Sequence, residues 1–207
     1  MIYIRKKNEP SWLAAQRAQY RTLSQMRQDT PNAARNHALW SELRQILTEE
    51  QHGLCGYCCR KITQDKAHIE HMKCQEFHPQ DSLSYENLIA SCDTKTTCGR
   101  YKGNNDTPTV RPTDTDCESQ FSYNLYTGEI IGHTPKAEAA IDVLNLNQYS
   151  LREARYATFR TALCYSEELV DMYLAAWPSF MNILKYARSG AGKNWEQFRL
   201  KRTRRNA

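Results

Sequence analysis

The sequence lacks a long hydrophobic run. No stretch of its 207 residues approaches the roughly 18 apolar residues that a membrane-spanning helix needs. The mean hydropathy of −0.76 is that of a polar chain. Residues 1–7 carry charges but no apolar stretch follows them, which is not the pattern of a secretory signal. We therefore expect a cytoplasmic protein that does not interact with a membrane.

The sequence also lacks an internal repeat and a complete phosphate-binding loop. Gly190-Ala-Gly-Lys193 hints at such a loop, but Ala187 stands at the position of its first glycine and Asn194 at that of its Ser or Thr. Nothing else in the sequence indicates nucleotide binding. Any dependence on ATP must therefore come from a partner.

The formal net charge of +5 permits a polyanionic partner without requiring one. Part of this charge lies in residues 189–207, where Trp195 and Phe198 stand among six cations. The cations of this tail are Lys193, Arg199, Lys201, Arg202, Arg204 and Arg205. The tail is either a solvated segment or an arm that contacts phosphates.

The length favours one globular domain, or one small domain with helical flanks. Apolar residues at helical spacing predict helices over residues 10–51, with a break near Pro31. Thr48 with Gln51 predicts a capping box for one more helical turn, which Gly53 would end. Between these helices and the later ones, residues 62–69 read as a short hairpin around Gln64–Lys66.

The second half of the chain predicts a hairpin and further helices. Residues 121–131 alternate around a Thr127-Gly128 turn, and Thr134-Pro135 begins a helix. A capping box at Ser150 opens a long helix that Pro178 interrupts. We expect an α+β fold with an N-terminal helical segment (1–52), a core (53–105) and a hairpin with C-terminal helices and a basic tail (106–207).

Cysteine is unevenly distributed along the chain. Six of the eight cysteines fall within residues 55–98, while Cys117 and Cys164 lie outside and read as ordinary buried thiols. In a reducing cytoplasm such a cluster indicates metal ligation rather than disulfides.

Two cysteine pairs are candidates for a structural zinc site. Cys55-Gly-Tyr-Cys58 has the short spacing of a zinc knuckle, and Cys92 with Cys98 forms a looser pair 33 residues further on. Cys59 or Cys74 could replace one member of the set. A redox CxxC is the alternative, but it usually opens a helix in a βαβ unit, and the sequence indicates no such unit.

The segment between the pairs carries groups suited to phosphodiester hydrolysis. His68-Ile-Glu-His71 places a carboxylate directly before an imidazole, and Arg100 and Lys102 follow the last cysteine. Hydrolysis needs a base to activate water, a role that imidazole suits. It also needs a metal to neutralise developing charge, and Mg²⁺ and Mn²⁺ prefer oxygen ligands such as a carboxylate.

These motifs together resemble a known family. The pattern runs from about Leu47 to Arg160 and is carried by Cys55-Gly-Tyr-Cys58, Ile69-Glu-His-Met-Lys73, Asn87-Leu-Ile-Ala-Ser-Cys92, Cys98-Gly99 with Lys102-Gly-Asn104, and Leu144-Asn-Leu-Asn147 with Leu151 and Arg155. It resembles the HNH endonucleases with their ββα-metal core, most closely the PtuB-type HNH subunit of the Septu anti-phage defence systems, which also occurs beside retrons.

The resemblance implies roles for individual residues. His71 would be the general base, Glu70 a ligand of a catalytic Mg²⁺ or Mn²⁺, and Asn87 a residue that orients His71. Gly99 stands where generic HNH proteins have a His or Asn ligand, so Asn104, Asp93 or water would complete the metal shell. Arg100, Lys102 and Lys73 would contact nucleic acid.

The resemblance also implies partners. The chain would be the effector of a defence complex with a PtuA-like ATPase subunit, and in retron systems with a reverse transcriptase and its RNA–DNA product. Its helical flanks either dock such partners or simply cover the core. The alternative function is a non-catalytic zinc module that binds nucleic acid or a partner protein, motivated by the missing ligand at Gly99.

Overall fold

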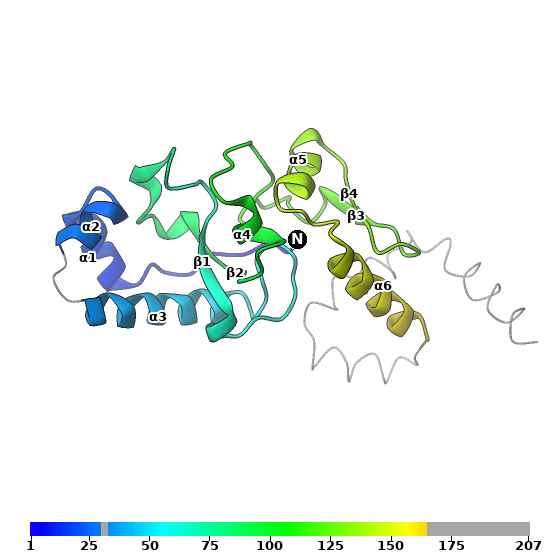
Figure 1. The fold of residues 1–207 in the computed structure, drawn as a ribbon, viewed down its shortest axis with the longest axis horizontal. Coiled ribbons are helices and arrows are strands. Elements are labelled where there is room, and N and C mark those ends of the chain that lie inside the picture. Colours follow the sequence, from blue (N-terminus) through cyan, green and yellow to red (C-terminus); the bar gives the residue numbers. More distant parts are fainter. Residues whose placement is uncertain (30–32, 165–207) are drawn as a thin grey trace, which may run out of the picture.

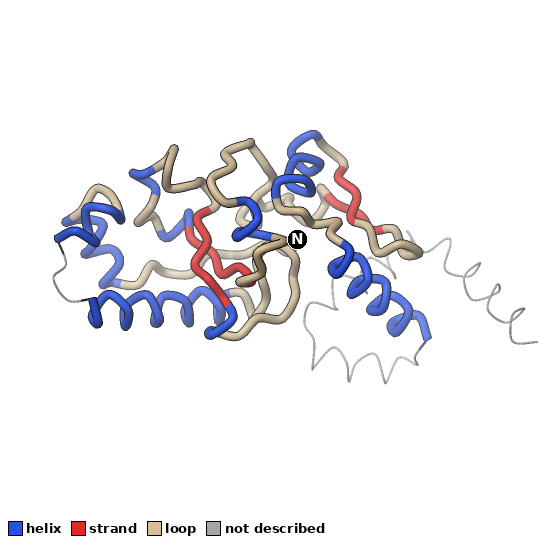
Figure 2. The backbone as a smooth tube through the Cα atoms, viewed as in Figure 1, coloured by secondary structure: helices blue, strands red, loops and turns tan. Residues whose placement is uncertain are grey.

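The computed structural model describes residues 1–29 and 33–164 (Figures 1 and 2). Its elements are α1 (Ser11–Gln19), α2 (Leu23–Asp29), α3 (Ala33–Glu50), β1 (Ala67–His71), β2 (Leu88–Cys92), α4 (Cys98–Lys102), β3 (Phe121–Tyr123), β4 (Ile130–Gly132), α5 (Pro135–Val143) and α6 (Tyr149–Cys164). Short 3₁₀ turns lie at Gln64–Lys66, Pro79–Asp81 and Tyr85–Asn87. The mixture of helices with two small antiparallel sheets confirms the α+β class.

Two antiparallel strands and a short helix form the centre of the molecule. β1 pairs with β2 in a register that sets His68 opposite Ser91 and Glu70 opposite Ile89, and α4 follows directly and contacts β2 (Figure 1). All five residues of β2 are buried, because α3 also packs on this sheet. α4 reaches β1 through a side chain, since the Lys102 ammonium pairs with Glu70 and donates to the His71 carbonyl.

The hairpin predicted over residues 62–69 is wrong. Gln64–Lys66 form a 3₁₀ turn, and β1 pairs with the distant β2 instead of with the residues just before it. Those preceding residues bond to the knuckle region: Leu54 bridges to Lys61, and the Ile62 amide donates to the Gly53 carbonyl over 2.8 Å. The residues before the 3₁₀ turn therefore pair with Gly53 and Leu54, and the residues after it pair with β2.

The N-terminal helical segment contains three helices where the sequence predicts two. Tyr20 is extended and ends α1, and the Thr22 hydroxyl accepts from the Gln25 amide at the start of α2. The capping box at Thr48 is also wrong, since α3 runs through this residue and its hydroxyl donates to the Arg44 carbonyl. The helix ends as predicted before Gly53, which has φ +73°.

A buried ion pair fixes the N-terminal segment that precedes α1 to α3 and β2. The ammonium of Lys6 lies 2.6 Å from Glu50 Oε2 and also donates to the Leu88 carbonyl. Glu50 Oε1 accepts from the Tyr85 hydroxyl at 3.0 Å. Apolar side chains from all three N-terminal helices pack into the same core, namely Leu13, Leu23, Met26, Leu43 and Leu47.

The segment Leu144–Asn147 joins the second half of the chain to the central core. The Leu144 carbonyl accepts from the Cys98 amide at 2.8 Å, and the Asn145 side chain donates to the Thr96 carbonyl. The Asn147 amide exchanges two hydrogen bonds with the backbone of Ile130 in β4. This explains why the segment is polar at alternate positions: Leu144 and Leu146 are buried between these bonds.

The predicted hairpin and the helix after Thr134 are both present. Phe121–Tyr123 pairs with Ile130–Gly132, and the Thr134 hydroxyl accepts from the Ala137 amide as an N-cap. α6 begins one residue before Ser150, because the side chain of Gln148 accepts from the Ser150 amide. Its predicted interruption at Pro178, the side chain of Cys164 and the basic tail at 189–207 lie outside the described residues.

Within the described ranges no helix is long and apolar enough to cross a membrane.

Candidate metal centre and the adjoining polar cluster

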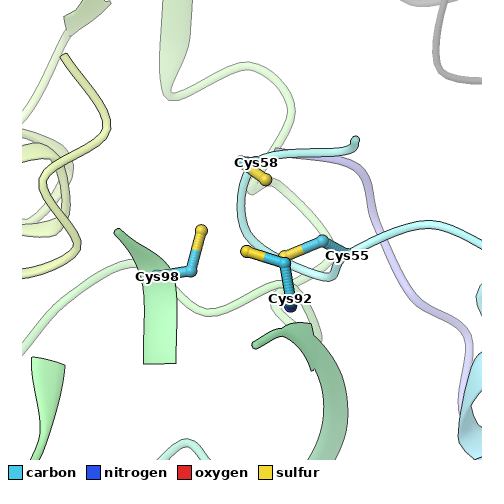
Figure 3. A group of neighbouring side chains, drawn as sticks. All are labelled: Cys55, Cys58, Cys92 and Cys98. Atoms are coloured by element: carbon cyan, nitrogen blue, oxygen red, sulfur yellow. The ribbon is translucent and has the colours of Figure 1, made fainter. Parts of the chain in front are cut away.

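The four cysteines predicted to bind zinc lie together. The sulfur atoms of Cys55, Cys58, Cys92 and Cys98 all lie within 4.8 Å of one another (Figure 3). Two come from the knuckle, one from the last residue of β2 and one from the first residue of α4. Tetrahedral ligands at about 2.3 Å from zinc would stand roughly 3.8 Å apart. The cluster could therefore hold a metal ion such as zinc after small side-chain adjustments.

The backbone of the knuckle is shaped for this arrangement. The Cys92 amide points at Cys55 Sγ over 3.3 Å, a bond that stabilises a thiolate ligand. Gly56 packs its backbone onto β2, where an added Cβ would come within 2.9 Å of the Ile89 side chain. Cys59 has φ +61°, which turns the chain away after the knuckle. A larger residue at the second knuckle position would therefore require the side chains of Ile89 and Ile4 to shift.

The four thiols shift one another's pKa in opposite directions, because their hydrogen bonds favour the thiolate of Cys92 and raise the pKa of Cys58 and Cys98. Hydrogen bonds from the thiols of Cys55, Cys58 and Cys98 lower the pKa of Cys92. Partial burial works against the charge of Arg60, but the nearby sulfurs of Cys58 and Cys92 raise the pKa of its guanidinium overall. Arg60 is therefore a cation placed beside the cysteine cluster.

The other described cysteines do not take part. Cys74 Sγ faces Asp106 at 3.9 Å, and Cys117 Sγ lies 3.7 Å from the Pro112 carbonyl. Every cysteine in residues 55–117 is a free thiol, so the CxxC is not a disulfide in this structure.

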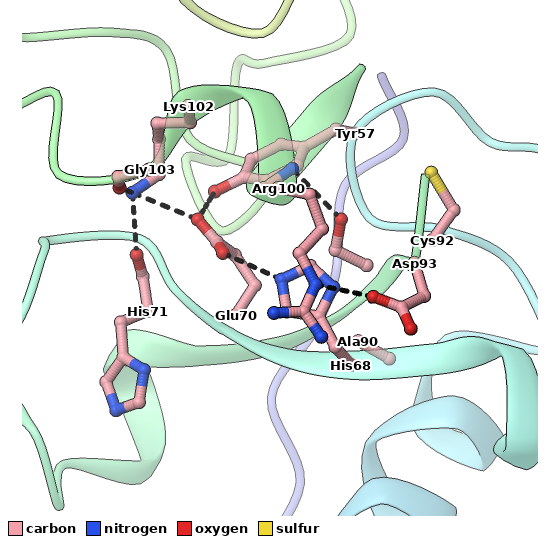
Figure 4. Close-up of polar contacts among 12 residues, drawn as sticks. Tyr57, His68, Glu70, His71, Ala90, Cys92, Asp93, Arg100, Lys102 and Gly103 are labelled. Atoms are coloured by element: carbon pink, nitrogen blue, oxygen red, sulfur yellow. Dashed lines mark hydrogen bonds and ion pairs between the residues drawn. The ribbon is translucent and has the colours of Figure 1, made fainter. Parts of the chain in front are cut away.

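Glu70 lies at the centre of a polar cluster beside the cysteines (Figure 4). Its Oε1 accepts from the Tyr57 hydroxyl at 3.2 Å and pairs with the Lys102 ammonium at 3.0 Å. Its Oε2 lies 3.1 Å from Nε2 of His68. Burial opposes ionisation, but His68 and Lys102 together lower the pKa of Glu70, so the carboxylate is charged at neutral pH. β1, the knuckle and α4 each contribute a side chain to this cluster.

Gly99 faces this carboxylate from the first turn of α4. A Cβ at Gly99 would come within 2.3 Å of Glu70 Oε2 and 2.9 Å of His68 Cε1. The space that a side-chain ligand at this position would need is taken by Glu70 and His68.

His71 ends β1, and its ring points away from the Glu70 cluster (Figure 4). Nε2 lies 2.9 Å from the Ser82 carbonyl, which can only accept, so Nε2 carries the proton. Nδ1 then presents a lone pair, and the exposed Gln75 donates to it over 3.1 Å. Burial lowers the pKa of His71, although the Ser82 bond opposes the shift, and the imidazole is neutral at pH 7.

Asn87 holds the loop that carries these contacts. Its Oδ1 accepts from the Lys73 amide at 2.7 Å, and its Nδ2 donates to the carbonyls of Lys73 and Asp81. Lys73 is two residues after His71, and Asp81 immediately precedes Ser82. Asn87 therefore ties the backbone just after His71 to the residue before Ser82.

The remaining candidate residues are spread around the cluster. Lys102 is buried, and its ammonium also donates to the His71 carbonyl at 3.0 Å. Arg100 is half exposed and pairs with Asp93 at 2.5 Å. Lys73 pairs with Asp81 at 2.7 Å. Asn104 lies on the surface and donates to Glu76, away from the partners of Glu70.

The sequence motifs imply no role for His68, Tyr57, Ser82 or Gln75. The alternation of a strand would have placed His68 on the same face as Glu70. Tyr57 lies inside the knuckle, but nothing in its spacing indicates that its hydroxyl reaches Glu70. Ser82 acts through its backbone carbonyl, for which the sequence carries no signal.

In comparisons with known proteins, no protein-family model matches this chain, and no curated protein matches it significantly. The structure by itself defines an α+β protein with a cysteine cluster that could bind a metal ion.

Proposed function

We propose that this chain is a metal-dependent HNH-type endonuclease that hydrolyses phosphodiester bonds in nucleic acid. The observation that carries the proposal is the state of His71. The Ser82 carbonyl fixes its tautomer, burial keeps it neutral, and Nδ1 retains a lone pair that only an exposed glutamine covers. Such an imidazole suits general-base catalysis near neutral pH.

The proposal assigns the two parts of the chemistry to neighbouring residues at the end of β1, His71 and Glu70. When Gln75 moves aside, Nδ1 of His71 takes a proton from the attacking water, while Ser82 holds the ring through Nε2. Glu70, already ionised, is the residue that would hold the catalytic divalent ion. When bound, that ion neutralises the charge that develops on the phosphate. Zinc in the four cysteines would be structural and hold the knuckle and α4 against β1 and β2.

Exposed cations near the cluster supply nucleic-acid contacts in this proposal. Arg100 and Lys73 are each paired with one carboxylate at the surface, and an exposed pair of this kind is weak enough to be exchanged for a phosphate. Lys102 is already bound to Glu70 and to the backbone, so its contribution is to hold α4 on β1.

The resemblance of the motifs extends the proposal to partners. We place the chain as the nuclease subunit of an anti-phage defence complex, with a PtuA-like ATPase and, in retron systems, a reverse transcriptase and its RNA–DNA product. The support for these partners is the sequence pattern, including Leu144–Asn147, whose role in the fold is to tie the hairpin to the cysteine cluster.

The direct test compares His71→Ala with wild type in the purified assembly, using Mg²⁺ or Mn²⁺ and plasmid and RNA substrates. We expect the substitution to slow cleavage by about 100-fold or more, because the general base is lost. His78→Ala is the matched control, since His78 is a partly exposed histidine paired with Asp106. Equal cleavage by wild type and His71→Ala would rule out this mechanism.

A second candidate function is a non-catalytic zinc module. It is favoured by one observation: Tyr57 and Lys102 already satisfy Glu70 Oε1, and Gln75 covers Nδ1 of His71. This candidate predicts nucleic-acid or protein binding without turnover, unchanged in Glu70→Ala. Metal-dependent cleavage that disappears in Glu70→Ala would exclude it.

A further inference from the structure

The face of β1 that carries Glu70 also carries His68. Residues two apart in a strand point to the same side, and these two side chains meet directly in front of α4 (Figure 4). Lys102 and Tyr57 contact Oε1 of Glu70, whereas His68 contacts Oε2. Nε2 of His68 and Oε2 of Glu70 therefore stand side by side as two possible donor atoms.

We propose that His68 Nε2 and Glu70 Oε2 are the two protein ligands of the catalytic divalent ion, and that Gly99 is glycine in order to admit them. The proposal rests on the proposed function and names the ligand set of the same site. The second metal ligand then comes from strand β1, whereas generic HNH proteins supply it from the helix.

The separation of the two atoms fits this role. Two ligands at about 2.1 Å from an octahedral ion and at right angles to each other stand roughly 3.0 Å apart. Nε2 of His68 and Oε2 of Glu70 are 3.1 Å apart. The pair can therefore form one edge of an octahedron without a change in their separation, while Oε1 keeps its bonds to Tyr57 and Lys102.

The other nitrogen of His68 is also informative. Among the described residues, Nδ1 of His68 is buried and has no hydrogen-bond partner. Among the same residues, the ring makes its polar contact through Nε2 alone, with the proposed co-ligand. A metal-ligating histidine usually donates its other ring N–H, so the case for ligation rests on the geometry of Nε2 and Oε2 and not on Nδ1.

Gly99 links this pair to the missing helix ligand. Any Cβ there would approach Glu70 Oε2 to 2.3 Å, so a side-chain ligand on the helix and this placement of Glu70 exclude each other.

The donor set of one imidazole and one carboxylate also determines which metal ion the site prefers. Imidazole suits transition metals, while Mg²⁺ prefers oxygen alone, so we expect Mn²⁺ to bind more tightly than Mg²⁺.

The test measures Mn²⁺ binding to the zinc-loaded full chain by the loss of the free-Mn²⁺ electron paramagnetic resonance signal. Wild type should bind one Mn²⁺, and His68→Ala, Glu70→Gln and Gly99→Ala should each weaken binding by about tenfold or more. Gly99→Ala removes no ligand, so its effect isolates the steric requirement. His78→Ala should bind as wild type does. Circular dichroism and zinc content check that each variant is folded.

One further variant separates ligation from a structural role. His68→Asp replaces nitrogen by oxygen, so it should retain binding but lower the preference for Mn²⁺ over Mg²⁺. Unchanged Mn²⁺ affinity in His68→Ala overturns the proposal, even if Gly99→Ala fails to fold. If His68 is required for Mn²⁺ binding but no cleavage is found, the site stands and the nuclease function fails. If His71-dependent cleavage persists in His68→Ala with the same metal requirement, the function stands and this site fails.

Discussion

The hydroxyl of Tyr57 lies 3.2 Å from Oε1 of Glu70, so a residue inside the cysteine knuckle touches the carboxylate of the neighbouring cluster. The two flanking cysteines fix the path of the knuckle, and Tyr57 itself is buried. The candidate zinc cluster and the proposed catalytic carboxylate are thereby connected through one side chain. If zinc occupies the cluster, its loss should disturb Glu70, even though none of the four clustered cysteines is among the hydrogen-bond or ion-pair partners of Glu70.

Tyr57→Phe tests this connection. The substitution removes one hydrogen bond to a charged acceptor and leaves the ring packing and all four sulfurs in place. We expect cleavage to slow by roughly fivefold to tenfold, about 1–1.4 kcal/mol, with zinc content unchanged. Tyr101→Phe, at an exposed tyrosine of α4, should have no effect. Wild-type rates in Tyr57→Phe would show that the contact does not position Glu70.

Cys92→Ser tests the metal centre itself. Removing one of four ligands should reduce zinc from about one ion per chain to near zero and lower the melting temperature sharply, because binding energy at such a site is folding energy. Cys117→Ser is the control, since this buried thiol lies outside the cluster. Zinc content is measured by mass spectrometry of the purified protein. Full retention of zinc in Cys92→Ser would contradict the assignment.

The ligand set of the metal centre was predictable because few residue types bind zinc and their spacing limits the choice. Cys55 and Cys58 fit one knuckle, and Cys92 with Cys98 forms the second pair, although the sequence alone leaves Cys59 and Cys74 open as substitutes. The gap at Gly99 was visible for the same reason: a position that should carry a ligand has no side chain.

What could not be predicted depends on contacts between distant positions. The partner of β1 lies beyond two 3₁₀ turns, so local patterning favoured a nearby hairpin that does not form. The place of His68 depends on the absence of a Cβ at Gly99. Lysine is usually exposed, and the burial of Lys102 follows only from its three partners, of which two are backbone carbonyls.

Glu50→Gln should destabilise the fold strongly. Glu50 neutralises the buried Lys6 ammonium, and its removal leaves an unpaired charge in the core. We expect the free energy of unfolding to fall by about 3–5 kcal/mol. Glu9→Gln breaks the pair with the exposed Arg17 and should change the free energy of unfolding very little, because solvent screens this pair. Urea unfolding of both variants gives the comparison. Equal losses of unfolding free energy in the two variants would mean that the buried Lys6–Glu50 pair stabilises the fold no more than the exposed pair does.

Arg155→Ala should loosen the second half of the chain from the core. The buried guanidinium donates to the carbonyls of Gly128 at 3.0 Å and Leu146 at 2.6 Å, joining the hairpin turn to the segment that bonds Cys98. Truncation leaves two carbonyls without this donor, and we expect a loss of about 2–4 kcal/mol in the free energy of unfolding. Arg152→Ala, whose side chain forms a partly exposed pair with Glu129, is the matched control and should cost less than about 1 kcal/mol. Hydrogen exchange should show faster exchange in β3 and β4 of Arg155→Ala, and equal protection in both variants would refute this role.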